Sequence, residues 1–427
     1  MSEITRTDAP APSEPPPPSS PVPATEPAPE GEVSSWVRRG VIAAVVVALG
    51  VWVSLPTLAI IAALVFMIFM HELGHYVTAK AAGMKVTEFF LGFGPRLWSF
   101  RRGETEYGIK AIPAGAYVRI IGMSNLEEVD PSEEDRTYRQ KPYWRRMSVA
   151  VAGSTMHFLM AIVLFFGVVT VIGNPDPTSS RWTIAALTED SAADAAGIQL
   201  GDRILSIDGN RFDTFDAMSD YLRENPGRDV TITVERVGRE LALETTLGST
   251  NDRGEEVGFL GVGPEYPNVR VNPLTGLVES VQATGETIWL SIKGLGAFFS
   301  PDGLSGYLDI LTGRDPAPEP GEVEDEGRII SVVGAVQLAS QSPDIVGVLY
   351  FLFAINVFIG VFNLVPLLPF DGGHVAIATY ERLRSRKGKR HFADVAKLMP
   401  VTYAVVALLA FVFISSLYLD IVDPISL

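Results

Sequence analysis

The sequence predicts a polytopic α-helical membrane protein with a cytoplasmic membrane-associated β-hairpin region and an extracytoplasmic β-rich α+β domain. Two observations lead to this class. First, 47% of the 427 residues are hydrophobic, only 20% are charged, and the mean hydropathy is +0.23. Second, several apolar runs are long enough to cross a hydrocarbon layer about 30 Å thick, and basic or turn-rich segments separate them. We expect four core transmembrane helices and one additional N-terminal helix.

The charge and the absence of cysteine exclude several functions. The net charge of -16 argues against a general nucleic-acid-binding protein, because phosphate attracts a basic surface. Without cysteine the chain cannot form disulfides, thiolate zinc sites, iron–sulfur clusters or a cysteine nucleophile. A transition metal would therefore be bound by His, Asp or Glu, and the sequence has only five histidines.

The N-terminal region divides where its composition changes. Residues 1–34 are rich in Pro, Ala, Ser and Glu, which predicts a disordered tail. The apolar run that follows is longer than one span needs and contains Pro56. We favour a helical hairpin, with an additional transmembrane helix at 35–55 and the first core helix at 56–82. The alternative is one long kinked helix, which gives four spans rather than five.

The remaining spans and their sidedness follow from hydropathy and loop charge. Loops 83–146 and 382–399 are rich in Lys and Arg, which predicts that both are cytoplasmic. Glycines and apolar residues alternate in the first of these loops, which predicts a β-hairpin that turns at 101–103. The other core transmembrane helices are expected at 147–173, 345–381 and 400–422.

The long segment between the second and third core helices is then extracytoplasmic. Residues 180–265 contain short strands between turn signals such as Asp208-Gly209, which predicts a compact β-rich domain. Residues 266–344 are expected to form a helix at 274–299, then a linker, and then a small apolar stretch at 329–340 that packs against the membrane face.

The first candidate for a catalytic site is His71-Glu72-Leu-Gly-His75, an H-E-x-x-H motif at the end of an apolar span. Positions i and i+4 share one face of a helix, so both imidazoles can reach one metal ion. Glu72 lies beside them and can take a proton from an attacking water. Ionisable residues at membrane depth are costly and mark functional sites.

A catalytic zinc site needs a third protein ligand, and the residues alone leave several candidates: Asp371, His374, His157 and His391. Asp371 lies in a segment that interrupts an apolar run with Pro366, Pro369 and two glycines. Irregular backbone at membrane depth is tolerated where it is buried in protein or lines a cavity. Asp371 could alternatively cap the helix that follows it.

Together these motifs resemble the site-2 protease family of intramembrane zinc metalloproteases, in its bacterial branch with an extracytoplasmic PDZ domain. The first motif matches at His71, Glu72 and His75. The second matches at Asn363, Pro366, Pro369, Asp371 and Gly372. The resemblance implies that Zn²⁺ is bound by His71, His75 and Asp371. It also implies that Glu72 is the general base, and that Asn363 binds the substrate backbone or stabilises the oxyanion.

The resemblance further implies a biological setting. Residues 180–265 would be the PDZ domain of a multi-pass protein of the bacterial cytoplasmic membrane. Substrates would be single-span membrane proteins in the lipid bilayer, such as anti-sigma factors or signal-peptide remnants, already cut by an upstream site-1-type protease. One departure is His157 in place of a common Asn, for which we expect a packing or positioning role. Two alternatives are a catalytically silent PDZ scaffold and an unrelated membrane zincin for protein quality control.

Overall fold

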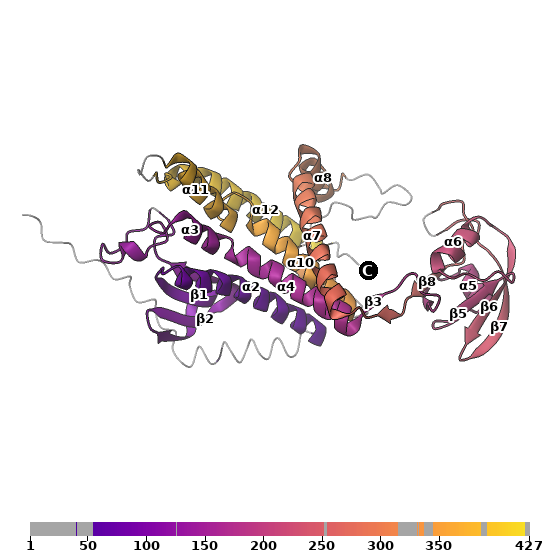
Figure 1. Cartoon of the computed structure of the whole chain (residues 1–427). Coiled ribbons are helices and arrows are strands. Elements are labelled where there is room, and N and C mark those ends of the chain that lie inside the picture. Colours follow the sequence, from indigo (N-terminus) through magenta and orange to yellow (C-terminus); the bar gives the residue numbers. More distant parts are fainter. Residues whose placement is uncertain are drawn as a thin grey trace, which may run out of the picture.

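The computed structural model describes Gly40, 54–124, 126–251, 254–314, Ser331, 333–336, 345–385 and 391–422. The predicted tail at 1–34 lies outside the described residues. The same holds for the predicted additional helix at 35–55, apart from Gly40 and its last two positions. Figure 1 shows a bundle of long helices, with the indigo β1–β2 sheet beside it and a separate β-rich unit that follows β3.

Within the described part of the chain, four segments are long and apolar enough to cross a membrane. The prediction of four core spans is therefore confirmed by length and composition. Figure 1 shows α2, α4 and α10 running alongside one another. The four segments are α2 (Leu55–Ala81), α4 (Ala152–Gly167) with its π-helical continuation η2 (Val168–Ile172), α10 (Ile345–Asn363), and η3 (Val395–Leu398) with α12 (Met399–Val422).

The bundle holds together through apolar side chains and close helix contacts. α2 begins where Ser54 accepts a hydrogen bond from the Thr57 backbone N–H at 3.3 Å, with Pro56 in the first turn. A Cβ on Gly74 of α2 would lie 2.8 Å from the Ala152 carbonyl oxygen of α4. The two backbones therefore approach this closely only because residue 74 is glycine. A buried cluster joins α2, the 333–336 segment and α10: Ile60, Met67, Val336 and Leu352.

The structure corrects three predicted boundaries. The first four residues of the span predicted at 147–173 belong to a separate helix, α3 (Tyr143–Ala150), and the membrane-length helix begins at Ala152. The single helix predicted over 345–381 is divided: α10 ends at Asn363 and α11 (Asp371–Arg384) begins after a proline-containing segment. Because α11 continues to Arg384, the first residues of the predicted 382–399 loop are helical.

The β-hairpin predicted in 83–146 is present, and its two long strands bend so that four segments pair with one another. β1 (Val86–Arg102) and β2 (Thr105–Ile120) are joined at Gly103, inside the predicted turn. Each strand bends, β1 at Gly92 and Gly94, which have positive φ. The first half of β1 therefore pairs with both halves of β2, whereas 96–102 pairs with the first half of β2 alone. The loop that follows contains η1 (Glu134–Arg136).

Residues 180–265 form the compact β-rich unit expected there. Its core contains Trp182, Ile207, Met218 and Ile232, each at most 2% exposed. Two sheets have the strand orders β4–β8 and β5–β6–β7. The elements are β4 (Thr183–Leu187), α5 (Ala192–Ala196), β5 (Arg203–Ile207), α6 (Phe215–Arg223), β6 (Asp229–Arg236), β7 (Arg239–Thr246) and β8 (Val262–Glu265).

The chain leaves the bundle through β3 (Asn174–Pro175) and returns to it through β9 (Asn268–Val269), and these two strands pair. The helix predicted at 274–299 is α7 (Pro273–Phe298), and it packs on α4 and α10. A further helix, α8 (Pro301–Thr312), follows it; its Tyr307 hydroxyl lies 2.7 Å from the Ser415 hydroxyl of α12.

Candidate metal centre

Three ligand atoms from two distant segments converge inside the bundle. His71 and His75 lie one turn apart on α2, and Asp371 is the first residue of α11. Asp371 Oδ2 lies 3.3 Å from His71 Nε2 and 3.2 Å from His75 Nε2, and the two Nε2 atoms are 3.2 Å apart. The side chains of His71, His75 and Asp371 are 12%, 10% and 19% exposed, respectively.

This triangle has the size that a zinc site requires. A tetrahedral ion with bonds of about 2.0–2.1 Å keeps its ligand atoms about 3.3–3.4 Å apart. Asp371 Oδ2 is buried and has no hydrogen-bond partner among the described residues, although both imidazoles are adjacent. A converging set of lone pairs is stabilised when a cation occupies its centre. The residues present therefore fit Zn²⁺.

The backbone of α3 orients one of the ligands. His75 Nδ1 donates a hydrogen bond of 2.8 Å to the carbonyl oxygen of Val149, which can only accept. The proton on Nδ1 leaves the lone pair of Nε2 directed at the metal position. Such a second contact fixes the tautomer and ring orientation of a metal-binding histidine.

A glycine of α4 makes room for the other imidazole. A Cβ on Gly153 would lie 2.2 Å from Cε1 and 2.6 Å from Nε2 of His71. No other residue fits at position 153 without displacing the His71 ring. The ring therefore lies against the backbone of α4, and the α2–α4 contact fixes its place.

Asp371 reaches the histidines because the chain turns sharply after α10. A Cβ on Gly372 would lie 2.2 Å from the Leu364 carbonyl oxygen, and one on Gly373 would lie 2.7 Å from the Leu368 nitrogen. The two glycines thus let the first turn of α11 pack on the 364–368 backbone. The N-cap position belongs to Phe370, so Asp371 is inside the helix and does not cap it.

The remaining candidate ligands do not join the triangle. His157 is 1% exposed, and its Nδ1 is hydrogen-bonded to Asn356 Oδ1 of α10, while its ring packs 5.1 Å from that of His71. The centre of the His374 ring lies 6.1 Å from the centre of the Tyr138 ring, and the centre of the His391 ring lies 5.7 Å from that of Tyr380. Asn356 was not among the predicted site residues, because its only signal in the sequence is an amide inside an apolar run.

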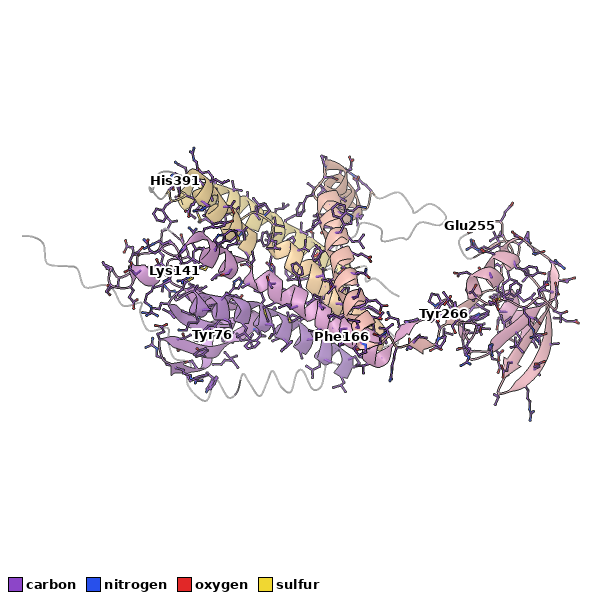
Figure 2. The ribbon with its side chains drawn as sticks, viewed as in Figure 1. Tyr76, Lys141, Phe166, Glu255, Tyr266 and His391 are labelled. Carbon is purple, nitrogen blue, oxygen red and sulfur yellow. The ribbon has the colours of Figure 1, made fainter. Side chains whose placement is uncertain are left out.

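The two residues expected to act on substrate come from α2 and α10. Glu72 is adjacent to the metal ligands in sequence, and its carboxylate lies against the backbone amide of Val118 in β2. Asn363 is the last residue of α10 and is half-buried. Figure 2 shows Tyr76, one residue after His75, beside the sheet, where its hydroxyl lies 2.5 Å from that of Tyr107.

A bundle of membrane-length helices with an H-E-x-x-H motif and a distant aspartate at one metal position defines a membrane metalloprotease. The sequence model of peptidase family M50 matches residues 59–409, and the chain belongs to this family. It is a zinc metalloprotease of the site-2 protease type, which confirms the predicted family, enzyme class and metal. This membership excludes the unrelated zincin and argues against the silent scaffold.

Related proteins match over most of their length. The zinc metalloprotease Rip1 of Mycobacterium tuberculosis is 34% identical over 403 residues, covering 86% of this chain and 96% of that protein. Rip1 of Mycolicibacterium smegmatis is 33% identical over 416 residues, covering 88% and 99%. Among solved structures, the PDZ domain of an SdrC-like protein from Listeria monocytogenes is 21% identical with a TM-score of 0.18, covering 21% of this chain and 92% of that one.

Proposed function

We propose that this protease cleaves peptide bonds inside the membrane-spanning segments of other membrane proteins. The depth of the metal centre carries this proposal. His71 lies about 24 Å from the start of α2 at Leu55 and about 15 Å from its end at Ala81. In a helix that crosses a hydrocarbon core about 30 Å thick, this position is within the lipid layer.

The proposed chemistry assigns a role to each residue of the site. His71, His75 and Asp371 hold Zn²⁺, which when bound supplies a Lewis acid and lowers the pKa of water to about 7. Glu72 takes the proton from the attacking water and returns it to the leaving amine. Asn363 donates from its amide to the substrate backbone or to the developing oxyanion. A donor of this kind is worth about 10²–10³ in rate.

A transmembrane helix has its backbone groups satisfied internally, so the substrate must unwind before it is attacked. The β1–β2 sheet offers a place for the unwound segment. The 112–120 half of β2 pairs with the first half of β1 on one side, and its Val118 lies against Glu72. A substrate strand that adds to this edge would run next to the catalytic base.

The proposed setting is the bacterial cytoplasmic membrane. We assign loops 83–146 and 382–399 to the cytoplasm from their excess of Lys and Arg, and residues 174–344 to the outside. The substrates are single-span proteins shortened by an upstream site-1-type protease, with anti-sigma factors and signal-peptide remnants as the candidate classes. Together these steps constitute regulated intramembrane proteolysis.

We assign the 180–265 unit as a PDZ domain that either binds peptides or limits access by size. A cavity of about 240 Å³ lies between α6 and the 257–262 segment, lined by Met218, Leu222 and Phe259 among others. The apolar side chains of this groove suit the side chains of a bound peptide. Figure 2 places Tyr266 where the chain leaves this unit.

Reconstitution tests the proposed cleavage. The purified protein is placed in liposomes with Zn²⁺ and a single-span substrate that lacks its extracytoplasmic domain, and the products are mapped by mass spectrometry. We expect a cut inside the span, and a loss of at least about 10² in rate for Glu72→Gln. Cuts confined to water-exposed segments, or equal cleavage by Glu72→Gln, would overturn the proposal.

The absence of native cysteine provides a direct test of sidedness. Glu240→Cys places one thiol on the surface of the 180–265 unit, and Ser132→Cys places one in the 83–146 loop. A membrane-impermeant maleimide applied to intact cells should label the first and reach the second only after lysis. The reverse pattern would contradict the assigned orientation.

A further inference from the structure

A buried ion pair connects the helix that carries Asp371 to the segment that supports His75. Arg146 Nη1 of α3 lies 2.5 Å from Glu381 Oε2 of α11, and the two side chains are only 10% and 5% exposed. The second carboxylate oxygen of Glu381 accepts a hydrogen bond of 2.7 Å from the Ala393 backbone N–H. Glu381 is thus anchored at both oxygens.

Tyr138 provides a second connection around the same pair. The Arg146 guanidinium lies 5.0 Å from the centre of the Tyr138 ring, and the centre of the His374 ring lies 6.1 Å from it. His374 is in the first turn of α11, three residues after Asp371. The last turns of α11 therefore contact Arg146 through Glu381, and its first turn contacts Tyr138 through His374.

The same short helix α3 contacts the other half of the metal centre. Val149, one turn after Arg146, accepts the hydrogen bond from His75 Nδ1 at 2.8 Å. α3 therefore touches His75 directly and holds α11, the helix of Asp371, through Glu381. Since Asp371 and Glu381 are ten residues apart, the pair acts about 15 Å from the carboxylate that it positions.

The energetics favour a positioning role over a stabilising one. Removing two charges from water costs about as much as their attraction returns, so a buried ion pair adds little net stability, and its best-attested role is to fix register. A slide of α11 by one residue would move Asp371 by about 1.5 Å. Metal–ligand bonds tolerate only about 0.2 Å.

We propose that Arg146 and Glu381 are positioning residues that set the distance of Asp371 from the two metal-binding histidines. The inference rests on the metal centre and the proposed roles of its ligands. It adds a structural unit, α3, that joins two ligands separated by 296 positions in the sequence.

The test measures zinc affinity and coordination rather than cleavage alone. Full-length protein in detergent is titrated against a zinc chelator, and Co²⁺ is substituted so that its visible absorption reports the ligand geometry. Arg146→Met should weaken zinc binding about 10–100-fold, the range typical of lost outer contacts, with the helix content retained. The charge-reversed double variant Arg146→Glu with Glu381→Arg should recover part of the affinity.

A matched control is available in the same region. Arg139 pairs with Glu134 at 2.6 Å with 17% and 30% exposure, and it lies in the loop before α3. Arg139→Met should leave the zinc affinity and the Co²⁺ spectrum unchanged. If Arg146→Met aggregates, Arg146→Lys replaces it, and a shifted Co²⁺ spectrum is expected because the planar guanidinium is lost.

The outcomes separate this inference from the proposed function. Wild-type zinc affinity and an unchanged Co²⁺ spectrum in the Arg146 variants would overturn the positioning role. A zinc affinity that falls equally in Arg139→Met would also overturn it, since the effect would then not be specific to α3. Retention of zinc by Asp371→Ala would instead refute the ligand set itself.

Discussion

Replacing Gly153 by alanine should disable the metal centre through a single methyl group. The new Cβ would lie 2.2 Å from Cε1 and 2.5 Å from Nδ1 of His71. Carbon atoms in contact prefer about 3.5–4.0 Å, so the ring or helix α4 must move by more than about 1 Å. A movement of this size exceeds the tolerance of a metal–ligand bond and costs about 10² in rate even without loss of the ion.

The assay compares Gly153→Ala with Gly167→Ala in the same helix. Apart from its chain neighbours and the backbone of its own helix, none of the described residues has an atom within 4 Å of a Cβ built on Gly167, so this control adds the same methyl group in open space. Zinc per chain is measured by mass spectrometry after dialysis, and cleavage of the single-span substrate is measured alongside. We expect loss of zinc and activity in Gly153→Ala only. Wild-type zinc content and cleavage in Gly153→Ala would refute the close packing of His71 on α4.

Two further predictions concern buried polar contacts. Asn356→Leu leaves His157 Nδ1 without its partner and should destabilise the protein by about 1–3 kcal/mol. Adding His157→Leu should recover much of this loss. Equal melting temperatures for Asn356→Leu and the wild type would contradict this prediction. In the 180–265 unit, the hydrogen bond from Arg236 lowers the pKa of Asp202, so the pair stabilises the fold at neutral pH and loses this effect as the pH falls below about 4. Arg236→Met should therefore speed hydrogen exchange in β5 and β6 at pH 7 but not in acid, and an equal effect at both pH values would count against the pair.

The candidate metal ligands could be located from the sequence because His71 and His75 form a short motif and the family resemblance indicated Asp371 in a second one. His71 and His75 are a helical turn apart, and Asp371 lies between a proline-rich segment and two glycines, which marks an irregular backbone. The structure brings together the three residues that the family resemblance indicated, and it leaves His157, His374 and His391 outside.

The supporting contacts could not be predicted in the same way. The fit of Gly153 on His71, the Val149 carbonyl on His75 and the Arg146–Glu381 pair all depend on how helices distant in sequence cross. The separation of α11 from α10 was predicted only in part. One helix was expected over 345–381 from its apolar character, although Pro366 and Pro369 indicated an interrupted backbone within it.

X-ray absorption at the zinc edge tests the central claim most directly. In the wild-type protein we predict two imidazole nitrogens at about 2.0–2.1 Å and carboxylate oxygen at about 2.0–2.2 Å, with no sulfur. Asp371→Ala should lose the bound zinc or the carboxylate contribution to its first shell. An unchanged spectrum and full zinc content in Asp371→Ala would show that α2 and α11 do not share a metal ion, which would contradict the account.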